Sequence, residues 1–294
     1  MTMNEASGPV AIIGTGGLNA SAWTRALLSK GIKVRSLVRR PEEHRSTAYQ
    51  EFVYFDLEQV SSHEVALAGV ESVALVTPAN LCQVANELRV IRAAIHSRVK
   101  RIVKLSVLGA ELPHPISFFA RSAADVERAL RDSAVNCVIL RSNAFMQNTL
   151  LQRKSIAAGR YVEPQGLPPC SFIDVEDIAE VAVKACSGEL DGQVLTLSGK
   201  AALSGRDIAL AYEVALGHKV DLSVLPLSEY KDMLSGAGLP EWRSGALMEL
   251  YDNLLKQKGS HLSQVGADLT PIIGRPARSF DQFVRSNIAA LSIN

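Results

Sequence analysis

Short apolar runs rich in β-branched residues alternate with stretches of helical period through the first half of this 294-residue chain. Such runs are typical of strands that are buried on both faces of a parallel sheet. We predict strands at Val10–Ile13, Lys33–Val38, Phe52–Phe55, Val73–Thr77, Arg101–Leu105 and Asn136–Leu140. Helices are predicted at Ala20–Lys30, Leu81–His96 and Ser122–Asp132, with a brief one between the second and third strands. This alternation predicts right-handed βαβ units, and hence an α/β fold with a doubly wound parallel sheet.

The pattern changes after Leu140. We predict a loop and helix within Asn143–Val162, with the helix ending at Gly159 before a new segment. An irregular proline-rich stretch follows, and then a helix that starts at Asp174–Asp177. A strand is predicted at Gln193–Leu197, followed by a helix that Ser204 caps and that runs to Leu216. From Pro226 onward the chain is amphipathic and helical, and Trp242–Lys256 is its longest predicted piece. The sequence therefore predicts a smaller, mostly helical C-terminal lobe beside the sheet.

Charge and composition exclude several classes of function. Thirty-one basic side chains against 30 acidic ones give a net charge of +1, which recruits neither nucleic acid nor an anionic membrane surface. The N-terminus has no signal-peptide pattern, and no apolar run approaches the ~20 residues of a membrane span. The four cysteines lack the spacing of a disulfide framework or a zinc site, so we expect buried reduced thiols and no metal. We expect a cytoplasmic monomer or homodimer that acts on a small molecule.

A glycine-rich turn follows the first predicted strand and precedes a helix. The turn reads Gly14-Thr15-Gly16-Gly17-Leu18-Asn19-Ala20. Gly14 permits the tight turn, Gly16 or Gly17 lets a pyrophosphate approach the backbone, and the helix N-terminus presents free N–H groups to the anion. Ala20 is the third small residue, where a larger side chain would push the helix from the strand. This context predicts dinucleotide binding, and the alternative is a glycine-rich loop without a ligand.

The second strand ends in Arg39 and Arg40, with no acidic residue before Glu42. A site for NAD(H) usually has Asp or Glu near this point, which binds the ribose 2′-hydroxyl. A guanidinium can instead pair with a 2′-phosphate, so the sequence favours NADP(H) over NAD(H). The alternative is that both arginines are solvated loop residues.

At this point the chain resembles a known family. The segments GTGGLNA, SLVRRPEE, FDLEQ, ALVTP, VKRIVKLSVLGAE, SFIDVEDIAEVAVKA and GRPARSFDQFV resemble those of NmrA-like atypical short-chain dehydrogenases/reductases, in the same order and over nearly the whole chain. The resemblance implies a Rossmann core that binds NAD(P)(H), and a substrate cleft beside a C-terminal lobe. The expected division is a flexible tail 1–8, a Rossmann core 9–141, a substrate-cleft segment 142–169, a return to the core 170–198 and a substrate lobe 199–294.

The resemblance also implies positions for the cofactor. It places Asp56 and Leu57 near the adenine, and Thr77 and Pro78 along the nicotinamide ribose. Asn143, Ala144 and Phe145 are expected near the nicotinamide and the substrate. Further residues that could line an apolar substrate site are Phe118, Phe119, Met146, Tyr161 and Trp242. Some of these aromatic side chains could equally belong to the core.

Departures from the family pattern bear on the chemistry. The usual glycine turn is GxTGxxG, and here Gly16 replaces the Thr and Ala20 the last Gly. Ser106 follows the fifth strand at the position of the family serine. The Tyr and Lys that complete the usual proton relay are replaced by Phe119 and Ala123.

A simple ketone needs its oxygen protonated as hydride arrives, whereas a quinone or an iminium ion does not need a buried acid. The candidate replacement donors are Ser106, Arg121 and His114. We therefore expect an NADPH-dependent oxidoreductase for a quinone-like or iminium-like acceptor. Two alternatives remain open: a non-catalytic NADP(H)-binding redox sensor, and non-redox catalysis in the same cleft.

Overall fold

The computed structural model describes residues 8–14, 16–256 and 261–291. Thr15 and nearly all of the predicted N-terminal tail lie outside the described residues. The chain forms two compact units. The first, which we call the sheet unit, comprises Met1–Ser106, Ser122–Arg141 and Ile178–Leu195. The second unit comprises Val107–Arg121, Ser142–Asp177 and Thr196–Asn294.

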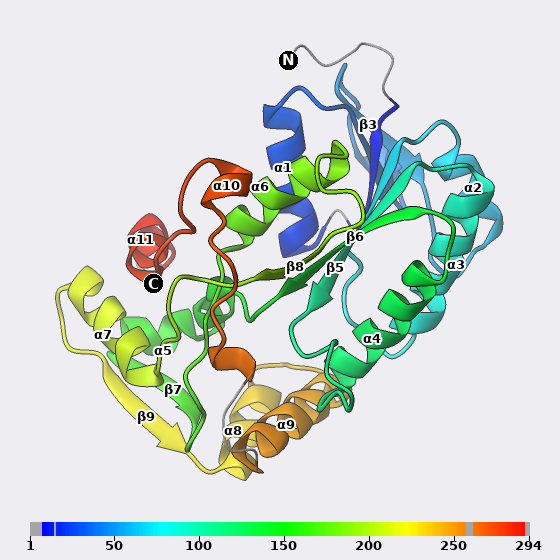
Figure 1. Cartoon of the computed structure of the whole chain (residues 1–294). Coiled ribbons are helices and arrows are strands. Elements are labelled where there is room, and N and C mark those ends of the chain that lie inside the picture. The colour runs from blue at the N-terminus through cyan, green and yellow to red at the C-terminus, as the bar shows by residue number, and fades with distance from the viewer. Residues whose placement is uncertain (1–7, 15, 257–260, 292–294) are drawn as a thin grey trace. The chain divides into compact units, whose positions relative to one another are not determined.

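A seven-stranded sheet with the order β3-β2-β1-β4-β5-β6-β8 organises the sheet unit (Figure 1). Its strands are β1 Val10–Ile13, β2 Val34–Val38, β3 Gln50–Tyr54, β4 Ser72–Leu75, β5 Arg101–Val107, β6 Asn136–Ser142 and β8 Val194–Leu197. The ladders β3–β2, β2–β1, β1–β4 and β4–β5 are parallel. Every strand predicted from the sequence is present, with ends that differ by up to two residues, and the predicted doubly wound α/β fold is confirmed.

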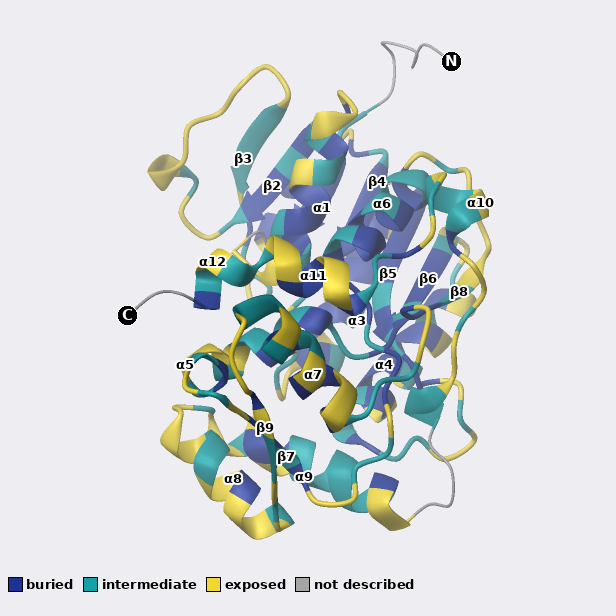
Figure 2. Ribbon diagram, turned by 90° about the vertical axis from the view of Figure 1, so that its left-hand side faces the viewer, coloured by how far each residue is buried: buried dark blue, intermediate teal, exposed yellow. Residues whose placement is uncertain are grey.

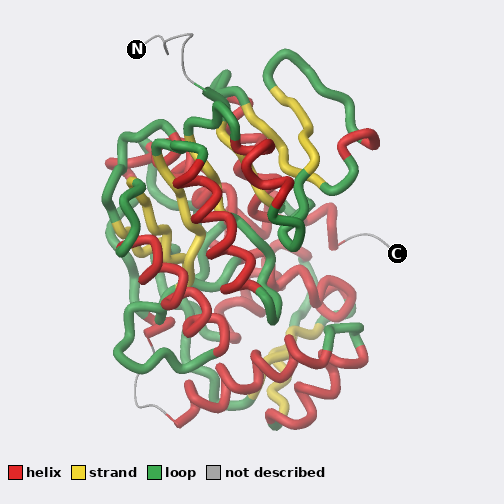
Figure 3. The backbone as a smooth tube through the Cα atoms, turned by 90° about the vertical axis from the view of Figure 1, so that its right-hand side faces the viewer, coloured by secondary structure: helices red, strands yellow, loops and turns green. Residues whose placement is uncertain are grey.

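Helices cover both faces of this sheet. They are α1 Leu18–Ser29, α2 Ser61–Leu67, α3 Gln83–His96, α4 Phe118–Arg131 and α6 Val175–Cys186. Helices α1 and α6 lie over one face (Figure 2), and α2, α3 and α4 lie over the other (Figure 3). Between β2 and β3 there is only the 3₁₀ turn Pro41–Glu43, consistent with the brief helix that was predicted there. Helix α2 was not predicted, because seven residues are too few to show a clear helical period.

Side chains from both layers form the core of the sheet unit. Leu75 and Ile102 of the sheet are fully buried against Val90 of α3 and Leu130 of α4. Four residues of the predicted α6 stripe are also fully buried: Ile178, Val181, Ala182 and Ala185. Strands that are buried along their whole length consist of apolar residues, and they can therefore be recognised as apolar runs in the sequence.

The described residues of the second unit form mainly helices, together with one two-stranded sheet of their own. It contains the 3₁₀ segment η2 Met146–Gln152, α5 Arg153–Ala157, β7 Arg160–Pro164, α7 Gly205–Leu216, β9 Asp221–Leu225, α8 Leu227–Gly236, α9 Glu241–Lys256, η3 His261–Ser263, α10 Thr270–Ile273, α11 Phe280–Ser286 and α12 Ile288–Leu291. Ser204 caps α7 through a reciprocal capping box with Asp207, as the sequence predicted. Helix α9 is the longest helix among the described residues, again as predicted.

Two expectations for this part of the fold were wrong in part, although the helix does end just before Gly159 and a new segment, β7, follows it. The helix predicted within Asn143–Val162 is broken into a 3₁₀ segment and a five-residue helix, and β7 then pairs in parallel with β9. These two short strands are separated by several helices in the sequence, so local pattern does not reveal their pairing. Of the four free cysteines only Cys170 and Cys186 are buried, whereas Cys82 is exposed on the loop before α3. No helix in the described part of the chain is long and apolar enough to cross a membrane.

Candidate functional site

The glycine turn lies at the carboxyl end of β1, where the strand order of the sheet reverses between β1 and β4. Ligands of open α/β sheets bind at such a switch point. Gly14 has φ +82°, and a Cβ at this residue would lie 3.1 Å from the carbonyl oxygen of Val76. Glycine is therefore required at this position by the backbone itself.

Gly16 differs from Gly14, because a Cβ added there would meet no described atom within 4 Å. The packing of the chain therefore gives no reason for glycine at this position. An open cradle over a bare backbone is the shape that a pyrophosphate needs for close approach. Thr15, predicted to be part of the same site, lies outside the described residues.

The N-terminus of α1 also fits an anionic ligand. Gly17 is its N-cap residue, no side chain caps the helix, and its first turn contains no acidic residue. The first N–H groups of such a helix are available to a phosphate. Leu18 is exposed, and the Oδ1 atom of Asn19 is buried without a hydrogen-bond partner among the described residues. Ala20 is buried, as its predicted packing role requires.

The two arginines after β2 differ in their surroundings. Both are exposed. Arg40 pairs with Glu43 in the following 3₁₀ turn, whereas Arg39 forms no hydrogen bond or ion pair with another described residue. Arg39 is therefore the better placed of the two to bind a phosphate.

The residues after β3 form a turn that is held by hydrogen bonds between side chains and the backbone. The side chain of Asp56 accepts a hydrogen bond from the N–H of Glu58 at 2.9 Å, and its carbonyl oxygen lies 2.7 Å from Nε2 of the buried His63. Leu57 packs against the core of the sheet unit. The fold thus fixes the chain at the edge where the resemblance places the adenine.

A buried polar network supports the end of β4. Thr77 donates a hydrogen bond to Glu87 of α3, and Gln83 donates another at 2.9 Å. The ammonium group of Lys104 lies 2.8 Å from the other carboxylate oxygen of Glu87. Pro78 follows Thr77, and its carbonyl oxygen accepts from Asn80 at 3.0 Å. The Glu87–Lys104 pair was not predicted from the sequence, although a lysine inside an apolar strand implies a buried counter-charge.

Ser106 at the end of β5 is bound to a buried carboxylate. Its hydroxyl donates to Oε1 of Glu127 on α4 at 2.6 Å. Glu127 is fully buried and also accepts from Arg141 at 3.0 and 2.6 Å and from Arg131 at 3.0 Å. Burial alone would raise the pKa of Glu127, but the hydrogen bonds from Arg141 and Ser106 outweigh it and hold that pKa below its usual value. The carboxylate is therefore charged, and the hydrogen in this contact belongs to Ser106.

The other two candidate donors have different environments. Arg121 forms an ion pair with Glu249 of α9 at 2.7 Å, and the backbone N–H of Phe118 donates to the same carboxylate at 2.9 Å. His114 is exposed on the loop before α4. At the two positions of the family's relay, Phe119 is half-buried and Ala123 is buried, and neither can supply a proton.

Asn143 is buried after β6 and organises loops of the second unit. Its amide nitrogen donates to Ser171 Oγ and to the carbonyl oxygen of Leu262, both at 2.8 Å. Its amide oxygen accepts from the N–H of Ala144 at 2.8 Å. Phe145 forms an isolated parallel bridge with Ile173. These contacts hold the segment Asn143–Phe145, which the resemblance places near the nicotinamide, in its loop conformation.

The residues predicted to line the substrate site fall into two groups within the second unit. Phe118 packs edge-on against Phe119 at 5.9 Å and against Trp242 at 6.1 Å between ring centroids. Met146 and Tyr161 belong instead to the buried core of that unit. The structure therefore brings three of the five residues into one aromatic cluster.

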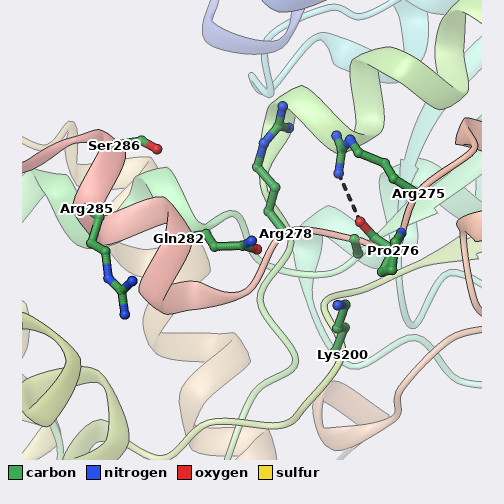
Figure 4. A pocket seen from close by; sticks show the side chains of 8 residues that line it. Lys200, Arg275, Pro276, Arg278, Gln282, Arg285 and Ser286 are labelled. Carbon is green, nitrogen blue, oxygen red and sulfur yellow. Dashed lines mark hydrogen bonds between the residues drawn. The ribbon is translucent and has the colours of Figure 1, made fainter.

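A basic hollow of about 530 Å³ lies elsewhere in the second unit (Figure 4). It is lined by Lys200, Arg275, Pro276, Ala277, Arg278, Gln282, Arg285 and Ser286. Arg275 and Arg278 both pair with the buried Asp177, at 2.6 and 2.9 Å. Two of its positive charges are thus shared with one carboxylate. No group of acidic, histidine or cysteine side chains in the described residues could hold a metal ion.

Comparison with known proteins identifies the class of protein that this fold and site define. The model of the NmrA-like family matches residues 6–268, and the chain belongs to that family. The resemblance seen in the sequence is thereby confirmed.

Two curated relatives and one solved structure are informative. The chain is 29% identical to an NAD(P)H azoreductase of Xenophilus azovorans, over 96% of this chain and 98% of that protein. It is 31% identical to the (4-alkanoyl-5-oxo-2,5-dihydrofuran-3-yl)methyl phosphate reductase of Streptomyces griseus, over 84% and 86%. The crystal structure of Citrobacter sp. triphenylmethane reductase complexed with NADP(H) matches with a TM-score of 0.82 at 20% identity, over 95% of this chain and 99% of that one.

Proposed function

We propose that this chain is an NADPH-dependent reductase that transfers hydride to a small organic acceptor of the quinone or iminium class. The two curated relatives are both reductases and are aligned over most of their length. The open cradle at Gly16, the uncapped start of α1 and the unpartnered Asn19 Oδ1 all fit a dinucleotide. Arg39 supports NADPH over NADH, because its guanidinium is exposed and has no described acidic partner.

One observation supports the choice of acceptor: the single hydroxyl hydrogen of Ser106 is donated to Glu127. A hydroxyl has one hydrogen to donate. Ser106 therefore offers a nearby ligand lone pairs and no proton. Because Phe119 and Ala123 occupy the two relay positions, the tyrosine and lysine that usually supply the proton are also absent there.

Whether hydride transfer can proceed without a proton donor in the site depends on the chemistry of the acceptor. A positioned acid contributes about 10²–10⁴ to the rate when an alkoxide must be protonated, so a simple ketone is a poor substrate here. Bound NADPH supplies the hydride and is oxidised by two electrons. An iminium carbon takes the hydride to form a new C–H bond and becomes a neutral amine without gaining a proton. A quinone becomes a hydroquinone anion, which takes its proton from water.

The test follows the loss of NADPH absorbance with quinones, iminium compounds and simple ketones as acceptors. We expect turnover with the first two classes at rates about 10²-fold or more above those with ketones. The control is Gly16→Val, which should lose NADPH binding and all turnover. Ketone reduction by the unmodified protein at a comparable rate would contradict the proposal. Tight NADPH binding without turnover on any acceptor would instead support the redox-sensor role.

A further inference from the structure

A half-buried carboxyl group without a cationic partner lies in the second unit, outside the network around Ser106. Glu163 is on β7, and its carboxyl group forms no hydrogen bond or ion pair with another described residue. Burial raises the pKa of this carboxyl to about 7, and no arginine or lysine lowers it. An isolated carboxylate in such a place is costly unless it takes up a proton or a positive charge joins it.

The fold makes room for this carboxyl group. A Cβ added at Gly205, the first residue of α7, would lie 2.3 Å from the carboxyl carbon and from both oxygens of Glu163. Any larger residue at position 205 would force this carboxyl group to move away from the backbone. Alanine is a far better helix former than glycine, so this position favours the carboxyl group over helix stability.

Three tyrosine side chains of the second unit lie within the electrostatic influence of the same carboxyl group. Tyr161 lies two residues before Glu163 on β7 and therefore on the same face of the strand. Tyr230 of α8 and Tyr251 of α9 pack edge to face with ring centroids 5.9 Å apart, and their hydroxyls are hydrogen-bonded. Burial, followed by the charge of Glu163, raises the pKa of Tyr161, and the same two causes raise that of Tyr230 to about 12. The phenols are therefore neutral, and close enough to Glu163 to sense its charge.

Other charged groups on the elements packed against β7 are directed elsewhere. The register partner of Glu163 on β9 is the apolar Val224. On α7, Asp207 is engaged in the capping box with Ser204. On α9, Asp252 pairs with Lys256. Glu213 of α7 is half-buried and accepts a hydrogen bond from the backbone N–H of Val220 at 3.1 Å. The remaining charged residues on α5, α7 and α8 are exposed: Arg153, Lys154, Arg206, Glu229, Lys231 and Asp232.

We propose that Glu163, Tyr161, Tyr230 and Tyr251 form a binding site for an organic cation, an ammonium or iminium group. Tyrosine faces attract cations by about 0.5–2 kcal/mol each, and the carboxylate supplies the compensating charge. An anion is repelled there, and a neutral group gains from neither the charge nor the ring quadrupoles. The proposal that this site binds a cation is independent of the proposed function. The further inference that the bound cation is the hydride acceptor rests on the proposed function.

The test compares two probes of equal shape, choline and its uncharged carbon isostere 3,3-dimethylbutan-1-ol. Binding is measured by titration calorimetry or NMR on the full chain without NADPH. We expect choline to bind about tenfold or more tightly than the alcohol. Because the carboxyl titrates at about 7, choline affinity should rise about tenfold between roughly pH 6 and pH 8.

Two variants assign the effect to this carboxyl group. Glu163→Gln should remove both the preference for choline and its pH dependence, and Glu229→Gln, an exposed carboxyl one residue before Tyr230, should change neither. Equal binding of choline and the alcohol, no binding of choline, or a pH dependence that survives in Glu163→Gln would each overturn the proposal. Choline binding without any NADPH turnover would leave this site standing and defeat the reductase assignment. Quinone turnover without choline binding would do the reverse.

Discussion

Replacing Glu127 by glutamine tests the charged network that takes the hydrogen of Ser106. The side chain is fully buried and accepts four hydrogen bonds, two from Arg141 and one each from Arg131 and Ser106. Glutamine keeps the shape and one carbonyl oxygen but removes the negative charge. Arg141 is only 15% exposed and would then lose its buried counter-ion.

The expected cost follows from this geometry. Removing one partner of a buried ion pair costs about 3–5 kcal/mol, and the retained amide oxygen places Glu127→Gln at the lower end, about 3 kcal/mol. For a chain of this size that corresponds to a fall in Tm of about 6–10 °C. The folded pKa of Glu127 lies below its usual value, so its stabilisation is present above the usual carboxyl range and is lost as the pH falls through the folded pKa. The difference between the native protein and the variant should therefore shrink in acid.

Calorimetric unfolding at neutral and acidic pH measures both effects. The matched control is Asp125→Asn on the same helix, which removes an exposed pair with Arg128 at 3.3 Å and should cost less than about 0.5 kcal/mol. If Glu127→Gln lowers Tm no more than this control does, or if the difference is the same at both pH values, the carboxyl is not a buried charge. The hydroxyl hydrogen of Ser106 would then not be committed to a carboxylate, and Ser106 could donate it to a ligand.

Two further predictions concern the cofactor. Arg39→Glu should weaken NADPH binding by about 1.5–3 kcal/mol and leave NADH binding unchanged, as calorimetric titration of both would show, whereas equal losses would refute a phosphate contact. Gly16→Val should abolish dinucleotide binding with little change in Tm, because the added side chain meets no described atom of the chain within 4 Å of its Cβ. A folded Gly16→Val protein that still binds NADPH would show that the turn has been misread.

The sheet could be predicted because its signals are local. Strand β1 lies at Val10–Ile13 as predicted, and α7 starts after Ser204, since buried strands and capping residues leave short-range patterns. The glycine turn could be recognised for the same reason. Local order could not reveal the pairing of β7 with β9, whose residues Arg160 and Asp221 are brought together only by the fold.

The buried charged residues of the structure were the hardest to predict from the sequence. Glu127 is one of several charged residues on α4, and its neighbours Asp125 and Arg128 are exposed, so the sequence alone gives no reason to bury it. Its burial depends on Arg141 and Ser106, which come from two different strands. Glu163 was missed because nothing in the sequence links it to Gly205, although the two lie in contact.

The contact between Gly205 and Glu163 couples how these two positions can change during evolution or engineering. Alanine at position 205 would displace the carboxyl group of Glu163 from its place on the backbone, so this otherwise favourable helix substitution carries a cost while Glu163 remains. Once position 163 carries a small side chain, the constraint disappears and alanine becomes the better residue at the start of α7. Homologous chains should therefore pair glycine at 205 with a long side chain at 163, or exchange both. The effect on stability of a substitution at one of these positions will therefore depend on the residue at the other, and single variants will not reveal it.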